Sequence, residues 1–357
     1  MYCLDEYLKP IWQGNIVYDE SVMVVKDSKG NIPLQPLAYD AKRIISVKNA
    51  MLTKEYTEGV DYLLADGKVK ILDNGSIFIM DYDEYFPKSD ENNKVFATDD
   101  GFTIWREGAF LHERQIVVTY EHEISDMYFP SNQKSDLSIN EKLRKKENIS
   151  LVFYGDSITF GWNSSEITNT SPYLPLWGKL TALGIKDRYG YDMVILENED
   201  FSGSGNIKYI NTAVSGTSAL WGLENVQERV CKYKADMVFL AFGMNNPKMD
   251  PDAFKDTLCK MIYEIRKDNP SCSIVLVATT HPNPYIVCTR GHREAFVPAL
   301  YQIKDELGNI AVSDMTTLHY QLLLRKPYHH MTGNNINHPN DFLMRQYAIM
   351  TLHSILD

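Results

Sequence analysis

Beyond residue 150 the chain alternates between short apolar runs rich in β-branched residues and longer segments with apolar residues at helical spacing. Few folds accommodate this pattern, because apolar runs without polar alternation are typical of parallel strands buried on both faces. The apolar runs span residues 151–157, 208–214, 236–243, 273–280 and 309–315. Helical spacing is found in residues 219–235, 251–268 and 292–308. This βαβ series predicts an α/β fold with a doubly wound sheet of five parallel strands and helices on both faces.

The first 130 residues follow a different rhythm, in which short β-like runs are separated by turn signals such as the DSKGN stretch. These runs span residues 21–25, 42–47, 69–72, 77–80, 102–105 and 114–120. Such spacing predicts a small antiparallel β-sandwich, which we assign to a domain covering residues 1–130. The polar, charge-rich stretch 131–149 is predicted to be a linker, and residues 150–357 form the second domain.

Composition narrows the range of partners and compartments. A formal net charge of −11 leads us to expect neither nucleic acid nor an anionic membrane as a partner, because both would repel the chain. The five cysteines lack CxxC spacing, so a disulfide framework or a structural zinc site is not expected. The first residues lack the basic start and apolar run of a signal peptide, and no stretch is long enough for a membrane span. We therefore expect a cytoplasmic protein, and the sequence leaves its oligomeric state open.

Candidate functional residues follow the first three apolar runs, at the edge where doubly wound sheets bind ligands. Ser157 stands in a tight strand-to-helix turn that can expose its hydroxyl beside free backbone N–H groups, although an isolated serine there is more often a helix N-cap. Gly216 follows the second run, where its backbone can approach a ligand or simply form a turn. Asn245 follows the third, and its amide can donate to an oxyanion or cap a turn.

A histidine stands just before the last predicted helix. His338 precedes Pro339, so its loop is rigid, and it comes last in the chain whereas Ser157 comes first. An imidazole held against a hydroxyl is what activation of a serine nucleophile requires. Taken alone, His338 is equally consistent with a general base and with a helix cap.

Together these four positions resemble the SGNH (GDSL-like) hydrolase superfamily, whose four blocks occur here in the family's order. The resemblance implies a flavodoxin-like sheet and a serine esterase that needs no cofactor. It implies that Ser157 is the nucleophile and His338 its general base. It also implies an oxyanion hole formed by the backbone amides of Ser157 and Gly216 and the side chain of Asn245.

Three further stretches resemble a bacterial carbohydrate-esterase-like branch that often carries an N-terminal β domain: Trp221-Gly222, the FGMN run and the NHPNDF stretch. This implies hydrolysis of small acyl esters, O-acetyl esters above all, on a small-molecule carbohydrate. Trp162 and Trp221 could stack on a sugar ring, with core packing as an equal alternative. The other hypotheses are a lipid, aryl or thioester acyl hydrolase and a carbohydrate-binding protein whose hydrolase core is degenerate.

Two positions depart from the family pattern. Asn246 replaces an aspartate in the third block, and we expect a structural role for it. Asn335 replaces the triad acid of the usual Asp-x-x-His motif. We therefore expect a Ser–His dyad in which Asn335, or a backbone carbonyl between residues 332 and 337, orients His338. Asp341 is more consistent with a first-turn carboxylate at the start of a helix than with a substitute acid.

No metal site is predicted. His281, His329 and His330 fall near the same edge, but no carboxylate or cysteine spacing completes a ligand set around them. The acidic stretch 81–93 lacks the spacing and the glycine of an EF-hand loop.

Overall fold

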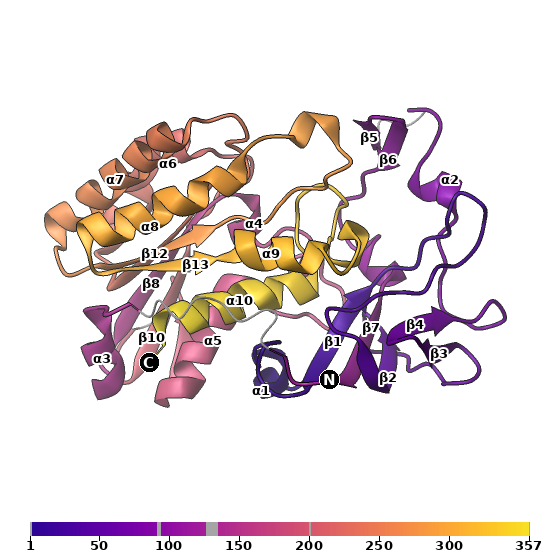
Figure 1. Ribbon diagram of the computed structural model, residues 1–357. Coiled ribbons are helices and arrows are strands. Elements are labelled where there is room, and N and C mark those ends of the chain that lie inside the picture. The colour runs from indigo at the N-terminus through magenta and orange to yellow at the C-terminus, as the bar shows by residue number, and fades with distance from the viewer. Residues whose placement is uncertain (1, 91–93, 126–134, 200, 357) are drawn as a thin grey trace.

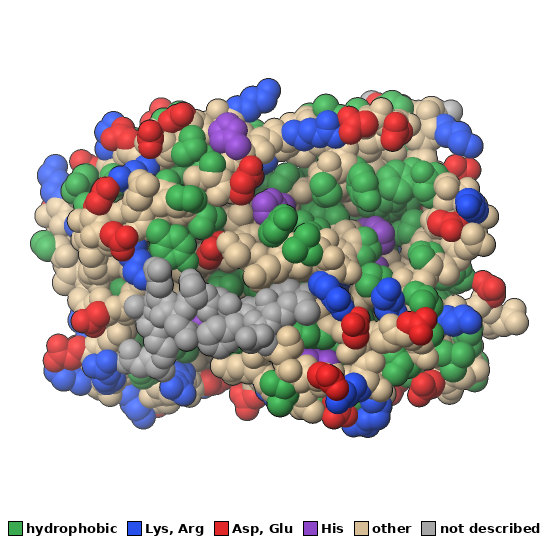
Figure 2. Space-filling model, viewed as in Figure 1, with side chains coloured by type: hydrophobic (Ala, Val, Ile, Leu, Met, Phe, Trp, Pro, Cys, Tyr) green, Lys and Arg blue, Asp and Glu red, His purple; other side chains and the backbone are tan. Residues whose placement is uncertain are grey.

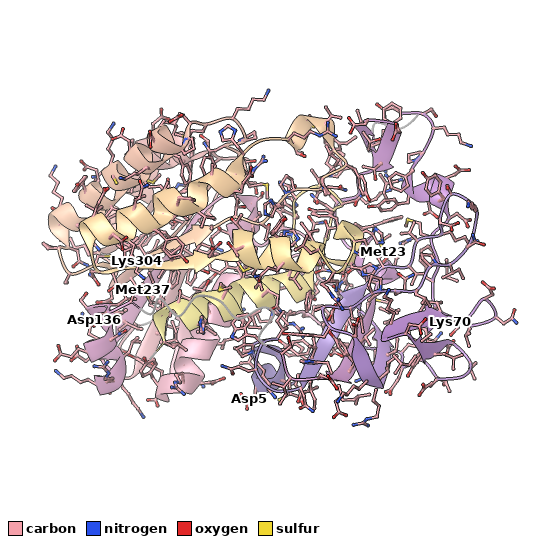
Figure 3. All side chains as sticks on the ribbon, in the orientation of Figure 1. Asp5, Met23, Lys70, Asp136, Met237 and Lys304 are labelled. Carbon is pink, nitrogen blue, oxygen red and sulfur yellow. The ribbon has the colours of Figure 1, made fainter. Side chains whose placement is uncertain are left out.

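The computed structural model describes residues 2–90, 94–125, 135–199 and 201–356. Two regions lie side by side, an N-terminal region of small antiparallel sheets and a C-terminal α/β region (Figure 1). The labelled Met23 and Met237, both fully buried, mark the interiors of these two regions (Figure 3). Within the described ranges, no helix has both the length and the apolar character needed to cross a bilayer.

A single parallel sheet forms the centre of the C-terminal region, with strand order β13-β12-β11-β8-β10-β9. Its strands are β8 (Ile149–Gly155), β9 (Met193–Leu196), β10 (Asn206–Asn211), β11 (Met237–Ala241), β12 (Ser273–Ala278) and β13 (Ile310–Asp314). The α/β fold is therefore confirmed, and the five predicted strands have the flavodoxin-like order. The described residues contain a sixth strand, however, because β9 is a short edge strand in which only Ile195 is buried. Its apolar run, Met193–Leu196, is only four residues long and too short to identify a strand by itself.

Helices cover both faces of this sheet, as a doubly wound fold requires (Figure 1). One face carries α5 (Trp177–Tyr189) and α10 (Asp341–Ile355), and the other carries α6 (Ala219–Arg229), α7 (Pro251–Asp268) and α8 (Phe296–Leu307). The connections change direction between β8 and β11, which are neighbours in the sheet. The crevice at this switch point is the position at which open α/β sheets bind ligands.

The N-terminal region contains antiparallel sheets, as predicted, arranged as one three-stranded sheet and two separate hairpins. The three-stranded sheet has the order β1-β7-β2 and comprises β1 (Ile16–Val22), β2 (Ala41–Asn49) and β7 (Ile116–His122). The hairpins pair β3 (Tyr62–Ala65) with β4 (Lys68–Ile71) and β5 (Val95–Thr98) with β6 (Gly101–Ile104). Two short helices, α1 (Leu4–Tyr7) and α2 (Tyr82–Tyr85), complete it.

One hydrophobic cluster spans both regions. A continuous cluster of buried residues includes Val118 and Tyr120 of β7 together with Phe342 and Tyr347 of α10. The fully buried side chains of Lys326 and Glu20 also pair across the boundary. The limits 1–130, 131–149 and 150–357 stay a prediction. Each region also has a hydrophobic cluster of its own, around Met23 and Met80 in the N-terminal region and around Val152 and Val238 in the C-terminal one.

The predicted linker contains a helix. α3 (Ile139–Lys145) lies against the parallel sheet, where Lys142 Nζ is 2.6 Å from Asp236 Oδ1 and the backbone amide of Ile139 donates to Ser273 Oγ. Part of the predicted linker, residues 131–134, lies outside the described residues. The remainder therefore packs as part of the C-terminal region.

Candidate active site

Ser157 lies where β8 turns sharply into the short helix α4 (Ser157–Phe160). The side chain of Asp156 caps this helix, because its Oδ1 accepts a hydrogen bond from the backbone amide of Ile158 at 3.0 Å. Gly155 has no room for a side chain, since a Cβ would lie 2.4 Å from the carbonyl oxygen of Ala241. This close approach of β8 and β11 places the serine directly above the edge of the sheet.

His338 forms a hydrogen bond with this serine. The distance from His338 Nε2 to Ser157 Oγ is 3.0 Å, although the residues are 181 positions apart in the chain. Both residues are nearly buried, with exposed fractions of 5% for Ser157 and 9% for His338. A hydroxyl and an imidazole in this geometry can exchange a proton, which is the step that activates a serine nucleophile.

The loop that carries His338 is held by its own polar side chains. Asn334 Oδ1 accepts hydrogen bonds from the backbone amides of Ile336, Asn337 and His338 at 2.9 to 3.1 Å. Thr332 Oγ1 donates to the carbonyl oxygen of His338 at 3.0 Å. These bonds fix the backbone from which the imidazole extends.

The other imidazole nitrogen faces two residues that the sequence did not indicate. His338 Nδ1 lies 2.6 Å from Asn163 Oδ1 and 3.6 Å from Glu107 Oε2. Asn163 follows the serine turn, whereas Glu107 belongs to the N-terminal region. Asn163 carried a weak signal, because it comes six residues after Ser157 in a Gly-Trp-Asn turn. Glu107 carried none, because it lies in a region expected to form another domain.

Asn335, which we expected as one candidate for orienting His338, has a different position. Its Oδ1 accepts from Tyr85 Oη at 2.6 Å, and its Nδ2 donates to Thr103 Oγ1 at 2.9 Å. The residue adopts a φ of +68°, in the left-handed region that asparagine tolerates better than most residues. The side chain therefore points into the N-terminal region, and Asn163 occupies the place beside the imidazole.

The expected oxyanion donors follow β10 and β11 on either side of β8. Gly216 is exposed at a φ of +76°, and nothing lies within 4 Å of the position that a Cβ would take. Asn245 Nδ2 donates to the carbonyl oxygen of Thr217 at 3.0 Å, which leaves its second hydrogen for a ligand. Asn246 is structural, because its Oδ1 accepts from the backbone amide of Ala219 at the start of α6.

The two tryptophans have different surroundings. Trp162 is 38% exposed, its ring stacks on Phe160, and its Nε1 donates to Ser215 Oγ beside Gly216. Trp221 instead packs against the core on the α6 side of the sheet, with its ring near Tyr154. Of the two sugar-stacking candidates, only Trp162 presents an open ring beside the serine turn.

The pKa values of two carboxyl groups near Ser157 and His338, those of Asp156 and Glu107, shift in opposite directions. Complete burial raises the pKa of Asp156 to about 6. Partial burial would also raise the pKa of Glu107, but its hydrogen bonds and its attraction to His338 outweigh this and lower the pKa to about 2. Glu107 therefore carries a full negative charge at neutral pH.

The three other histidines that the sequence placed near this edge have separate surroundings. Burial lowers the pKa of His329 to about 3, and His330 Nε2 is 3.2 Å from Gln35 Oε1. His281 lines a separate cavity of about 990 Å³ between α8, the helix α9 (Met315–Leu323) and the loop after β12. Neither member of the Ser–His pair lines that cavity. Among the residues that the structure describes, no group of three potential metal ligands is found.

A serine hydroxyl that is hydrogen-bonded to a histidine at the switch point of a doubly wound sheet is typical of hydrolytic α/β enzymes. The model of the GDSL-like lipase/acylhydrolase family matches residues 153–345. The chain belongs to this family, which consists of carboxylic ester hydrolases. No curated protein matches its sequence.

Several solved structures share part of the fold. A two-domain esterase active on acetylated mannans is 18% identical with a TM-score of 0.45, over 60% of this chain and 51% of that one. This chain thus matches about half the length of that esterase. An acetyl xylan esterase from Geobacillus stearothermophilus is 18% identical with a TM-score of 0.44, over 59% of this chain and 97% of that one. An α/β hydrolase from the metagenome of Lake Arreo is 16% identical with a TM-score of 0.43, over 58% and 94%.

Proposed function

We propose that this protein hydrolyses small acyl esters, above all O-acetyl esters, of carbohydrates, with Ser157 as nucleophile and His338 as general base. The observation that carries this proposal is the 3.0 Å contact between Ser157 Oγ and His338 Nε2 within the family's domain. Ser157 follows β8, and Gly216 and Asn245, the two further oxyanion donors of the proposal, follow the neighbouring strands β10 and β11.

The reaction follows from this geometry in two steps. In the first, Ser157 Oγ attacks the ester carbonyl while His338 Nε2 accepts the hydroxyl proton and passes it to the leaving alkoxide. In the second, His338 takes a proton from water, the hydroxide attacks the acyl-enzyme, and the carboxylic acid leaves as Ser157 regains its proton. The amides of Ser157 and Gly216 and the side chain of Asn245 donate to the oxyanion in both steps.

The aromatic residues beside the serine favour a carbohydrate alcohol. Phe160 and Trp162 stack with ring centroids 5.5 Å apart, and each is 38% exposed. The backbone amide of Trp162 donates to the carbonyl oxygen of Ser157 at 3.1 Å, so this aromatic surface is fixed next to the nucleophile. Exposed aromatic faces pack on the C–H faces of sugar rings, and Ser215 offers a hydroxyl beside them.

The surface favours a neutral substrate over a polyanion. On the face shown in Figure 2, Lys and Arg side chains alternate with Asp and Glu and form no continuous basic patch. With a formal net charge of −11, the chain would repel nucleic acids and anionic membranes at long range. A neutral acetylated sugar meets no such barrier.

The test is a substrate screen with detection of the released acid by mass spectrometry. Acetylated monosaccharides and oligosaccharides, p-nitrophenyl acetate, longer-chain lipid esters and acyl thioesters are compared at equal concentration. The proposal expects acetate release from the sugars by the wild type and none by Ser157→Ala. Faster cleavage of lipid esters or thioesters would point to the alternative acyl hydrolase. Calorimetric binding of sugars without turnover of any ester would show a degenerate, binding-only protein.

A further inference from the structure

We propose that the N-terminal region completes the catalytic machinery, with Glu107 supplying the negative charge that faces His338 and Asn163 fixing the orientation of the imidazole. This inference rests on the proposed function, because it needs His338 to act as a base. A histidine base needs a proton on its far nitrogen and an acceptor for that proton. In this chain both groups that face Nδ1 are residues to which no role has been assigned.

Asn163 is the direct acceptor. It is only 1% exposed, and its Oδ1 lies 2.6 Å from His338 Nδ1. Its Nδ2 donates to the carbonyl oxygen of Gly108 at 3.2 Å, so the N-terminal region determines which end of the amide faces the imidazole. Gly333 allows this contact, because a Cβ there would lie 2.5 Å from Asn163 Cβ. The imidazole is thereby protonated on Nδ1, which leaves Nε2 to accept the proton of Ser157.

Glu107 provides the charge. Its Oε1 accepts hydrogen bonds from Trp105 Nε1 and Asn334 Nδ2, both at 2.9 Å, so its Oε2 is left facing His338. Asn334 also accepts from the backbone amide of His338, so one side chain connects the carboxylate to the loop that carries the base. A carboxylate 3.6 Å from Nδ1 stabilises the imidazolium that forms during attack.

Other ionisable groups near the imidazole do not take this role. The side chain of Asp156 accepts from the amide of Ile158, within the serine turn. Asp341 Oδ1 accepts from the amide of Ser165, and its Oδ2 lies 4.0 Å from His112 Nδ1. Arg106, beside Glu107 in sequence, donates to the carbonyl oxygens of Lys94 and Trp105. Glu107 is therefore the carboxylate that the structure places against the base.

The side chain of Asn335 is held away from the base by a separate set of contacts. Asn335 binds Tyr85 Oη, Thr103 Oγ1 and the carbonyl oxygen of Ile104, and so attaches the His338 loop to β6. On the far side of the β5–β6 hairpin, Asp99 pairs with Arg290 of the loop after β12. The position that the SGNH pattern gives to the acid thus fastens the N-terminal region, and that region brings an acid of its own.

The test measures kcat, KM and the pH–rate profile of Glu107→Gln on p-nitrophenyl acetate, with Glu113→Gln, an exposed residue of the same region, as control. Removing a triad carboxylate that touches the histidine can cost roughly 10⁴-fold. Glu107 acts at longer range and its side chain is 39% exposed, so a smaller loss is expected. We expect kcat to fall roughly 10- to 100-fold with little change in KM, because solvent screens a partly exposed charge. The pH–rate profile should also differ from that of the wild type, because the negative charge that faces the base has been removed.

A rescue separates an electrostatic role from a structural one. Asn163→Asp puts a carboxylate directly against Nδ1, so the Glu107→Gln/Asn163→Asp double variant should recover most of the lost kcat. NMR of ¹⁵N-labelled histidine gives a readout without turnover, and Asn163→Ala should shift neutral His338 away from the Nδ1–H tautomer. If wild type cleaves esters and Glu107→Gln keeps kcat within twofold with an unchanged profile, the assignment of Glu107 is wrong. If wild type cleaves no ester at all, the proposed function and this inference both fail.

Discussion

The two regions contribute to the site in different ways. In the C-terminal region Ser157, Gly216 and Asn245 each follow a strand of one parallel sheet, so the backbone topology alone brings these three residues to one edge. In the N-terminal region Glu107 reaches the site through a loop after a short hairpin, and its position depends on side-chain hydrogen bonds to the His338 loop. Placement at strand ends follows from the α/β fold itself. The placement of Glu107 depends on how the N-terminal region of this protein packs against the His338 loop.

The largest loss of activity is expected from substitutions in the C-terminal region, at the nucleophile and its base. Ser157→Ala and His338→Ala should each abolish ester hydrolysis almost completely, by roughly 10⁶-fold in kcat, because nucleophile and base act as one unit. The double variant should be no worse than either single one. Circular dichroism should show the native fold in all three, and the release of p-nitrophenol gives the rates. A double variant markedly slower than both would show that the residues do not act together.

A smaller effect is expected from the oxyanion donor. Asn245→Ala should lower kcat by roughly 10²- to 10³-fold, because its amide meets charge only in the transition state. Asn246→Ala is the matched control, since Asn246 caps α6 and should affect stability more than turnover. Steady-state kinetics on p-nitrophenyl acetate measure kcat and KM for both variants. A change confined to KM would identify Asn245 as a substrate-binding residue.

Asn335→Ala tests the junction between the two regions. It removes buried hydrogen bonds to Tyr85 and Thr103 and places alanine at a φ of +68°, so we expect a loss of about 2–4 kcal/mol in the free energy of unfolding. The kcat of the folded protein should fall less than tenfold, because the side chain does not touch the imidazole. Urea unfolding of this variant and of Asn335→Gly, which tolerates the φ, separates the strain from the lost bonds. A kcat loss equal to that of His338→Ala would restore Asn335 as the orienting residue.

The last comparison concerns the carboxyl groups of Asp156 and Glu107. Their substitution should change how the stability of the fold depends on pH. Burial raises the pKa of Asp156 to about 6, so the folded state binds this proton more tightly than the unfolded chain does. Asp156 therefore destabilises the fold above pH 6, and this cost disappears as the pH falls toward the unfolded value. Asp156→Asn should stabilise the protein by up to about 3 kcal/mol at pH 8 and by almost nothing at pH 4. Urea unfolding of both proteins at these pH values measures the difference. A stability difference that does not change with pH would show that Asp156 has the same pKa in the folded and unfolded states.

The carboxyl of Glu107, in the N-terminal region, contributes to stability with the opposite dependence on pH. The pKa of Glu107 is lowered to about 2, so its contribution to stability is complete above the unfolded value and is lost as the pH falls toward 2. Glu107 thus stabilises the fold in the neutral range in which Asp156 costs free energy. The difference reflects their surroundings, because Glu107 accepts hydrogen bonds from Trp105 and Asn334 and faces His338, whereas Asp156 is fully buried.

Much of the fold could be predicted because it depends on local patterns. Five strands of the parallel sheet were recognisable because they lie in largely apolar runs rich in β-branched residues. β9 has only the four-residue apolar run Met193–Leu196, which is too short to identify a strand by itself. The antiparallel character of the first 130 residues was also predictable. The hydrophobic cluster that they share with α10 was not, since packing between two distant segments leaves no pattern in either one.

The sequence by itself determined the residues that follow strand ends, because the strand pattern, the tight turn at Gly155 and the chain order from Ser157 to His338 are all local properties. Only the tertiary structure decided what faces the far side of the imidazole. Asn335 lies within three residues of His338 and yet turns away, whereas Glu107 lies more than two hundred residues away and faces it. Hydrogen bonds between side chains depend on how two regions pack, and no periodicity in the chain records that packing.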